Sequence, residues 1–161
     1  MPAATGPNPG EPAPGFELPN QYGEPVSLER LAGKPVVLVF YPFAFSRVCS
    51  GELAELASLQ PEFDAAGASL LAVSCDAKYS LRAWAAEQGW EFDLLSDFWP
   101  HGAVARRYGV FDENRGLATR SSFVIGADRI IRTVLSSAMG EPRDQAAYRE
   151  ALLELSTAGR S

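Results

Sequence analysis

Two patterns of apolar and polar residues alternate along the chain. Continuous β-branched and aromatic runs, PVVLVFY (35–41) and SLLAVSC (69–75), are typical of strands buried on both faces. Apolar residues spaced three or four apart predict amphipathic helices beginning near Arg47, over 80–89 and over 143–156.

Shorter elements complete the pattern. A strand is predicted around 93–95, a small helix near 103–108, and a hairpin over 121–135. Pro61 is expected to kink or end the first helix, because proline lacks the N–H that a helix needs. Ser80 and Gly89 are expected to cap the second helix. The order β-α-β-α-β-α-β-β-α predicts an α/β fold, a central mixed β-sheet flanked by helices.

The length and apolar content bound the number of domains. At 161 residues, of which 47% are apolar, the chain can form one domain with its own core but is short for two. Residues 1–14 are rich in Pro, Gly and Ala without periodicity, and are predicted to be a flexible lead-in. Residues 15–157 are predicted to form the single domain.

The charge and cysteine content exclude some functions. With 14 Lys and Arg against 20 Asp and Glu, the net charge is −6, which disfavours nucleic acid or an anionic membrane as a partner. Two cysteines and one histidine are too few for a typical four-ligand zinc site. Because cysteine is scarce and the first residues lack the pattern of a secretory signal, we expect a cytoplasmic protein whose cysteines are free thiols.

Cys49 is the most informative single residue. It follows the buried strand 35–41 and falls in the first turn of the predicted helix, where free N–H groups and the helix dipole favour the reactive thiolate. A helix terminus contributes at most about 2 kcal/mol, so a cation is also expected nearby. Arg47 is expected to point into solvent. Arg120 opens the apolar run SSFVI and is either that cation or an ordinary solvated charge at a strand end.

Ser46 and Pro42, which both precede Cys49, each have more than one interpretation. Ser46 stands where a Cys-x-x-Cys redox pair would have its first cysteine, so no local disulfide can form. Its hydroxyl can cap the helix, donate a hydrogen bond to a molecule approaching the sulfur, or both. Pro42 is either a rigid wall that shields the sulfur or simply a chain breaker after the strand.

With these residues in place, the chain resembles the peroxiredoxins. The segment PFAFSRVC (42–49) matches the family pattern Pro-x-x-x-Thr/Ser-x-x-Cys, and the segments LLSDFWPHGAVARRYGVF (94–111) and TRSSFVIGADRIIR (119–132) continue the similarity. The stretch SDFWPHG (96–102) is similar to the AhpE-type one-cysteine subgroup. The resemblance covers the chain from about Ala13 to the last helix, and it implies a thioredoxin-like (peroxiredoxin) fold.

The resemblance also implies a set of site residues. Cys49 would be the peroxidatic cysteine, Arg120 would hold both thiolate and peroxide, Glu52 would orient Arg120, and Trp99 would line the pocket. Pro42 and Ser46 complete the site, although threonine is commoner in the family at the position of Ser46. The activity would be thiol-dependent reduction of hydrogen peroxide or organic hydroperoxides, without a metal or organic cofactor.

The catalytic cycle then depends on the second cysteine. Attack on a hydroperoxide turns Cys49 into a sulfenic acid, which must be reduced again. Cys75, at the end of the strand 69–75, is either a possible resolving cysteine or a small core residue. If Cys75 is inert, an external thiol completes the cycle: a glutaredoxin-like protein, a low-molecular-weight thiol or thioredoxin. The family resemblance also favours a homodimer.

Two other functions remain open at this level. The first is a monothiol thiol–disulfide oxidoreductase of the thioredoxin-like fold, and the second is a non-enzymatic module or chaperone that retains Cys49. His101 is not expected to act as a general base, because an ionised sulfur needs none; we expect a surface or interface histidine.

Overall fold

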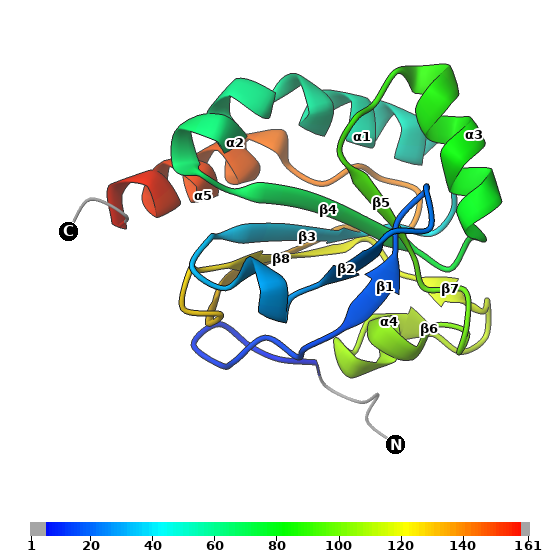
Figure 1. The fold of residues 1–161 in the computed structure, drawn as a ribbon, viewed down its shortest axis with the longest axis horizontal. Helices are drawn as coiled ribbons and strands as arrows, with labels where there is room; N and C mark the ends of the chain where they lie inside the picture. Colours follow the sequence, from blue (N-terminus) through cyan, green and yellow to red (C-terminus); the bar gives the residue numbers. More distant parts are fainter. Residues whose placement is uncertain (1–5, 159–161) are drawn as a thin grey trace.

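A five-stranded mixed sheet forms the centre of the protein. The computed structural model describes residues 6–158. The strands lie in the order β5-β4-β3-β8-β9 (Figure 1). β3 (Val36–Phe40), β4 (Ser69–Ser74) and β5 (Asp93–Ser96) are parallel, while β8 (Ser121–Ile125) runs antiparallel to β3 and to β9 (Ile131–Ser136). The predicted strands and their hairpin are therefore confirmed.

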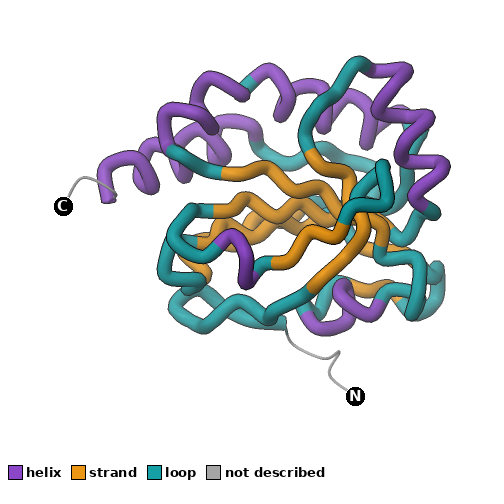
Figure 2. The backbone as a smooth tube through the Cα atoms, in the orientation of Figure 1, coloured by secondary structure: helices purple, strands orange, loops and turns teal. Residues whose placement is uncertain are grey.

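Helices cover both faces of this sheet unequally. α1 (Arg47–Ser58), α2 (Gln60–Ala66), α3 (Lys78–Gln88) and α5 (Gln145–Ala158) lie on one side, as Figure 2 shows. The short α4 (Ala103–Arg107) packs on the opposite side. This is the predicted thioredoxin-like arrangement of a mixed sheet between helices.

Several short elements were not predicted from the pattern of apolar and polar residues. The N-terminal hairpin comprises β1 (Glu17–Pro19) and β2 (Pro25–Ser27), followed by the 3₁₀ turn η1 (Glu29–Leu31). A second small hairpin joins β6 (Phe111–Asp112) to β7 (Leu117–Ala118). These strands are only two or three residues long, so they are too short to show an alternating pattern.

The alternation of side chains along each buried strand divides the core into two clusters. Val37 and Val39 of β3 face α1, α2, α3 and α5, whereas Val36, Leu38 and Phe40 face α4 and the N-terminal hairpin. Successive strand residues point to opposite faces, and both faces are covered, which explains why the run is continuously apolar.

Helix boundaries correct some details of the sequence prediction. α3 begins earlier than predicted, with Ala77 and not Ser80 at its N-cap, while Gly89 ends it in the left-handed conformation at φ 74°, as predicted. Pro61 lies in the first turn of α2, where a missing N–H costs nothing. α5 begins at Gln145, so Arg143 lies in the loop before it.

The predicted lead-in is partly fixed to the sheet. Glu11 O accepts a hydrogen bond from Ile131 N at 2.9 Å, Ala13 N donates to Arg129 O at 2.9 Å, and Pro12 bridges to Ile130. Residues 10–13 therefore pair with the turn between β8 and β9, and the prediction of a flexible segment over 1–14 does not describe them. This pairing is non-local, so composition gave no sign of it. Residues 1–5 lie outside the described range. No helix among residues 6–158 is long and apolar enough to cross a membrane.

Candidate active site

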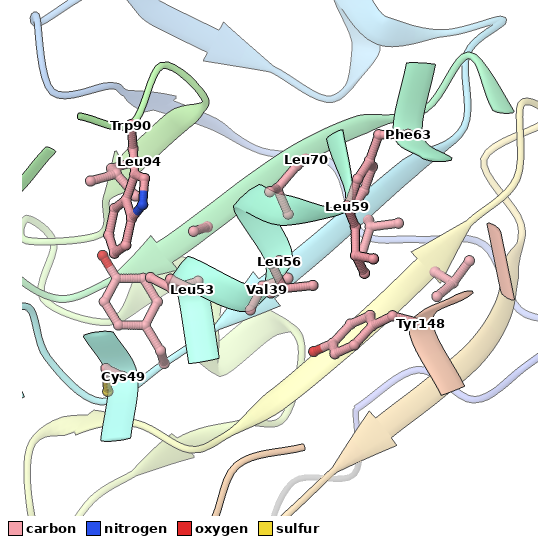
Figure 3. Close-up of a cluster of buried hydrophobic side chains, with 14 of the residues drawn as sticks. Val39, Cys49, Leu53, Leu56, Leu59, Phe63, Leu70, Trp90, Leu94 and Tyr148 are labelled. Atoms are coloured by element: carbon pink, nitrogen blue, oxygen red, sulfur yellow. The ribbon is translucent and has the colours of Figure 1, made fainter. Parts of the chain in front are cut away.

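Cys49 lies at the start of α1, directly beyond the carboxyl end of β3. Ser46 is the N-cap of α1, and its Oγ accepts a hydrogen bond from the backbone N of Cys49 at 3.2 Å. The Cys49 side chain is 0% exposed. Figure 3 shows the sulfur at the margin of the larger core cluster, with Leu53 and Leu56 further along α1. The strand-to-helix junction predicted for Cys49 is therefore present, and Ser46 caps it.

The guanidinium of Arg120 lies beside this sulfur. Arg120 immediately precedes β8, and its Nη2 donates to Cys49 Sγ at 3.2 Å. Its Nη1 donates to Glu52 Oε1 at 3.1 Å, and its Nε donates to the carbonyl oxygen of Met139 at 2.6 Å. Of the two interpretations of Arg120, the structure supports a buried cation, because only 3% of the residue is exposed.

Glu52 joins Arg120 to a second buried arginine. Its Oε2 accepts a hydrogen bond from Arg143 N at 2.6 Å and lies 3.6 Å from Arg143 Nε. Arg143 in turn donates to Ser122 Oγ at 2.8 Å and to the carbonyl of Phe40, the last residue of β3. Arg143 was not predicted as a site residue, because it stands at the polar start of the predicted helix 143–156, where an arginine is ordinarily solvated.

The buried charges of the residues around Cys49 do not balance one another. Arg120, Arg143 and Glu52 are each at most 3% exposed, so two positive charges and one negative charge lie out of water. Buried charges are costly unless they are paired. One further negative charge at the sulfur, as in the thiolate form with which a cysteine attacks, would leave the cluster with no net charge. Arg120 Nη2 is the charged donor that contacts this sulfur.

A pocket lies next to Cys49 and opens to solvent. Its volume is about 540 Å³. Arg120 and Ser46, which both contact Cys49, line it together with Pro42, Phe43, Arg47, Val48, Arg115, Leu117, Met139 and Gly140. A small molecule in this pocket would meet mostly apolar side chains, with polar hydrogen-bond donors at the end nearest the sulfur.

Trp99 is not brought to this pocket. Its side chain is 81% exposed, and it is not among the lining residues. Pro42 does line the pocket. His101 is an exposed residue whose Nε2 lies 2.7 Å from Gly116 O, away from the sulfur, as expected for a surface histidine. Among residues 6–158, no group of three or more His, Cys, Asp or Glu side chains could hold a metal ion.

Cys75 lies on the other side of the sheet. Leu71 and Val73 of β4 belong to the core cluster on the α4 side, and the alternation continues to Cys75, whose thiol lies near Ala118 and Asp97. Cys49 belongs to the opposite cluster. Burial raises the pKa of Cys75 from 9.0 to about 12, with Asp97 contributing next. Cys75 is therefore an un-ionised thiol at neutral pH, and both cysteines are free.

A fold of this type, with a buried cysteine beside an arginine at a strand-to-helix junction, defines a thiol peroxidase of the thioredoxin-like class. The family model AhpC/TSA matches residues 9–134. The chain belongs to this peroxiredoxin family and is a thiol-dependent peroxidase.

Individual relatives agree with this assignment. Alkyl hydroperoxide reductase E of Mycobacterium tuberculosis is 44% identical over 149 residues, which cover 92% of this chain and 97% of the relative. The crystal structure of peroxidoxin BcpB from Mycobacterium tuberculosis superposes with a TM-score of 0.80 at 34% identity, covering 92% of this chain and 96% of that one. Enterococcus faecalis AhpC gives a TM-score of 0.85 at 28% identity, covering 94% of both chains.

Proposed function

We propose that Cys49 is the nucleophile of this peroxidase and that Arg120 and Ser46 stabilise the charge that moves during the reaction. The observation that carries the proposal is the 3.2 Å contact between Arg120 Nη2 and Cys49 Sγ inside a buried cluster of charged side chains. Glu52 fixes the orientation of Arg120 through the 3.1 Å ion pair. Pro42 contributes to the pocket wall and limits the access of water.

The first half of the cycle oxidises the cysteine. The thiolate of Cys49 attacks the terminal oxygen of a hydroperoxide, so that an S–O bond forms as the O–O bond breaks. The departing oxygen takes the electron pair of that bond and a proton, and it leaves as water or an alcohol. Negative charge therefore moves from sulfur to the departing oxygen. Hydrogen-bond donors already fixed beside both positions lower the barrier because they need no reorganisation.

The second half of the cycle uses an external thiol. Because Cys75 lies on the opposite face of the sheet, it is not placed to resolve a sulfenic acid at Cys49. A thiol of a glutaredoxin-like protein, thioredoxin or a low-molecular-weight compound attacks the sulfenic sulfur and releases water. A second thiol then breaks the mixed disulfide and restores Cys49. This cycle fits the reducing cytoplasm, where such thiols are abundant.

The pocket favours organic hydroperoxides over hydrogen peroxide. Phe43, Val48, Leu117 and Met139 give it an apolar lining, and burying each methylene of a substrate against such a lining is worth about 0.8 kcal/mol. The relative named alkyl hydroperoxide reductase E supports the same substrate class. Arg47 and Arg115 also line the pocket, so a negatively charged organic hydroperoxide fits its electrostatics.

A homodimer is the oligomer we propose. Phe43 and Phe45, in the loop before α1, are 48% and 51% exposed, and Phe98 and Trp99, which follow β5, are 51% and 81% exposed. Exposed aromatic side chains of this size are enriched at protein interfaces. Sedimentation of the wild-type chain and of a Phe45→Ser variant, expected to shift toward monomer, tests this.

The peroxidase assignment of Cys49 is tested by a Cys49→Ser variant. We expect it to be folded and to lose peroxide consumption in the presence of dithiothreitol, while Cys75→Ser retains it. Residual activity of the Cys49→Ser protein near that of the wild type would overturn the proposal. The other function considered from the sequence, monothiol disulfide exchange, predicts insulin reduction without peroxide.

A further inference from the structure

Asp76 lies at the edge of the sheet from which α1 departs. β3, β4 and β5 are parallel neighbours, so their carboxyl ends meet at one edge. Asp76 follows the end of β4 at Ser74. Side chains at the carboxyl ends of adjacent parallel strands commonly build functional sites. Here the same edge carries the loop that leads from β3 to Cys49.

Hydrogen bonds connect Asp76 to this loop, to the end of β4 and to the end of β5. Its Oδ2 accepts from the backbone N of Ala44 at 2.8 Å and from Ser74 Oγ at 2.6 Å. The carbonyl oxygen of Asp76 accepts from Ser96 Oγ at 2.6 Å. Ser74 and Ser96 are 0% and 4% exposed. The carboxylate therefore has a fixed position, and one of its oxygens holds the loop before α1.

The loop that Asp76 holds has an unusual conformation. Phe45, next to Ala44, has φ 67°, in the left-handed region that a bulky non-glycine residue adopts only when its surroundings impose it. Ser46 follows directly and caps the turn that contains Cys49. The Phe45 ring also packs 6.1 Å from the Trp84 ring, centroid to centroid. A tether at Ala44 thus acts on the segment that determines where Cys49 lies.

The two half-reactions of the proposed cycle require different conformations of this segment. Peroxide attack needs Cys49 beside Arg120 and Ser46, as in the structure. Reduction by an external thiol needs an accessible sulfur, yet Cys49 is 0% exposed. The first turn of α1 must therefore move before a protein thiol can reach a sulfenic acid there. A contact that favours the closed loop assists the first half and opposes the second.

We propose that Asp76 is a positioning residue for the peroxidase reaction: its carboxylate, through Ala44 N, holds the loop before α1 closed over Cys49. This inference rests on the proposed function, in which Cys49 is the nucleophile. Asp76 touches neither the sulfur nor the pocket, and it acts only through the backbone of the loop.

The test measures the two half-reactions separately in a Cys75→Ala background, which leaves Cys49 as the single thiol. In Asp76→Ala, we expect the second-order rate constant with hydrogen peroxide to fall about tenfold or more, because a charge-assisted hydrogen bond is lost. Reduction of the preformed sulfenic acid by dithiothreitol should be unchanged or faster. Trp84 fluorescence should change in the reduced variant, because the Phe45 ring leaves it.

Two further variants distinguish the loss of the hydrogen bond between Asp76 and Ala44 from a general destabilisation of the protein. Asp76→Asn keeps an oxygen acceptor for Ala44 N and should stay within about threefold of the parent for the peroxide step. Ser96→Ala disturbs the same edge without touching the carboxylate and should leave both half-reactions within about twofold, the range expected of a modest stability change. If Asp76→Ala does not fold, Asp76→Ser, whose side chain is too short to reach Ala44, replaces it.

The proposal is overturned if both half-reactions slow together, if the peroxide step stays within about twofold of the parent, or if Asp76→Asn is as slow as Asp76→Ala. Failure of the proposed function gives a different result, because Cys49→Ser would then retain peroxide consumption whatever residue occupies position 76.

Discussion

Arg120 Nη2 lies 3.2 Å from Cys49 Sγ, although 71 positions separate the two residues along the chain. The contact exists because β8 pairs with β3, which places the residue before β8 next to the strand exit that leads to α1. The same guanidinium is held by Glu52 and by the Met139 carbonyl, so its position is fixed before any peroxide arrives. Such preorganisation is what electrostatic catalysis requires.

Replacing this guanidinium should slow peroxide attack much more than it destabilises the fold. The Arg120→Lys substitution keeps the positive charge. The lysine ammonium, however, lacks the planar set of donors with which the guanidinium contacts Cys49, Glu52 and Met139 at the same time. We expect the second-order rate constant with peroxide, measured by stopped flow, to fall about 100-fold, the usual effect of losing one fixed donor to a developing charge. Arg149→Lys, on the exposed side of α5, is the matched control. A fall of less than about threefold would contradict the assignment of Arg120.

Neutralising Glu52 should destabilise the protein. Glu52 is 1% exposed and lies between two buried arginines, so Glu52→Gln leaves their charges poorly compensated. Breaking a buried ion pair on one side typically costs about 3–5 kcal/mol in the free energy of unfolding. Urea denaturation should show a loss of this size. Glu55→Gln, an exposed site on the same helix, should change the stability by less than about 0.5 kcal/mol. Equal effects of the two substitutions would refute the charge balance.

The sequence was sufficient to predict the main strands and the position of Cys49. Buried strands such as 35–41 show a continuous apolar run, and Cys49 follows the first of them at a helix start. The apolar run after Arg120 left two interpretations of this residue open, and the family resemblance added its role and that of Glu52. The approach of Arg120 to Cys49 depends on the pairing of β8 with β3, which no local pattern reveals. Trp99 shows the limit of that resemblance, since it is largely exposed and lies outside the pocket.

Arg143 and Asp76 were not predicted as site residues, for different reasons. Arg143 precedes an amphipathic helix, where charged residues are normally solvated, and only the tertiary fold buries it against Glu52. Asp76 carried a usable signal that was overlooked: a polar residue directly after a buried strand, at the edge that Cys49 also occupies. Its partner is a backbone N–H of Ala44, which has no sequence signature.

The pocket lining should control the choice among hydroperoxides. Leu117 lines the same pocket as Arg120, and a long alkyl chain would bury methylene groups against it. In Leu117→Ser, we expect the ratio of the rate constants for a long-chain alkyl hydroperoxide and hydrogen peroxide to fall about fourfold, equivalent to about one lost methylene contact. Tyr22→Ser, at an exposed aromatic residue outside the pocket, should leave the ratio unchanged. An unchanged ratio in Leu117→Ser would contradict the preference for organic hydroperoxides.

One equivalent of peroxide should not produce a disulfide within a chain. Cys49 packs in the cluster on the α1 side of the sheet, whereas the Cys75 thiol lies near Ala118 of the cluster on the α4 side, so a bond between them would need a large rearrangement of the core. Non-reducing mass spectrometry of the wild type should show addition of one oxygen or, with an added thiol, a mixed disulfide at Cys49. Cys75→Ala should turn over at the same rate as the wild type. Loss of two hydrogens mapped to a Cys49–Cys75 link would disprove the one-cysteine cycle.

The burial of the Cys75 thiol should be detectable through its effect on the stability of the protein at alkaline pH. Burial raises its pKa from 9.0 to about 12, so the folded thiol stays neutral while the unfolded one ionises. A group whose pKa is raised on folding stabilises the protein fully below the unfolded value, and this contribution is lost as the pH rises, here between pH 9 and about 12. At pH 10 the loss from Cys75 is about 1.4 kcal/mol.

Comparison with Cys75→Ala isolates this effect from the other groups that titrate in the same range. Burial also raises the pKa of Tyr41, Tyr108 and Tyr148, but these residues are common to both proteins. The wild type and the variant should therefore both lose stability above neutral pH, and the wild type should lose about 1.4 kcal/mol more between pH 7 and pH 10. Denaturation curves measured at the two pH values give this difference directly. If the wild type and Cys75→Ala weaken equally, the Cys75 thiol reaches water in the folded protein, and its description as a buried neutral thiol is wrong.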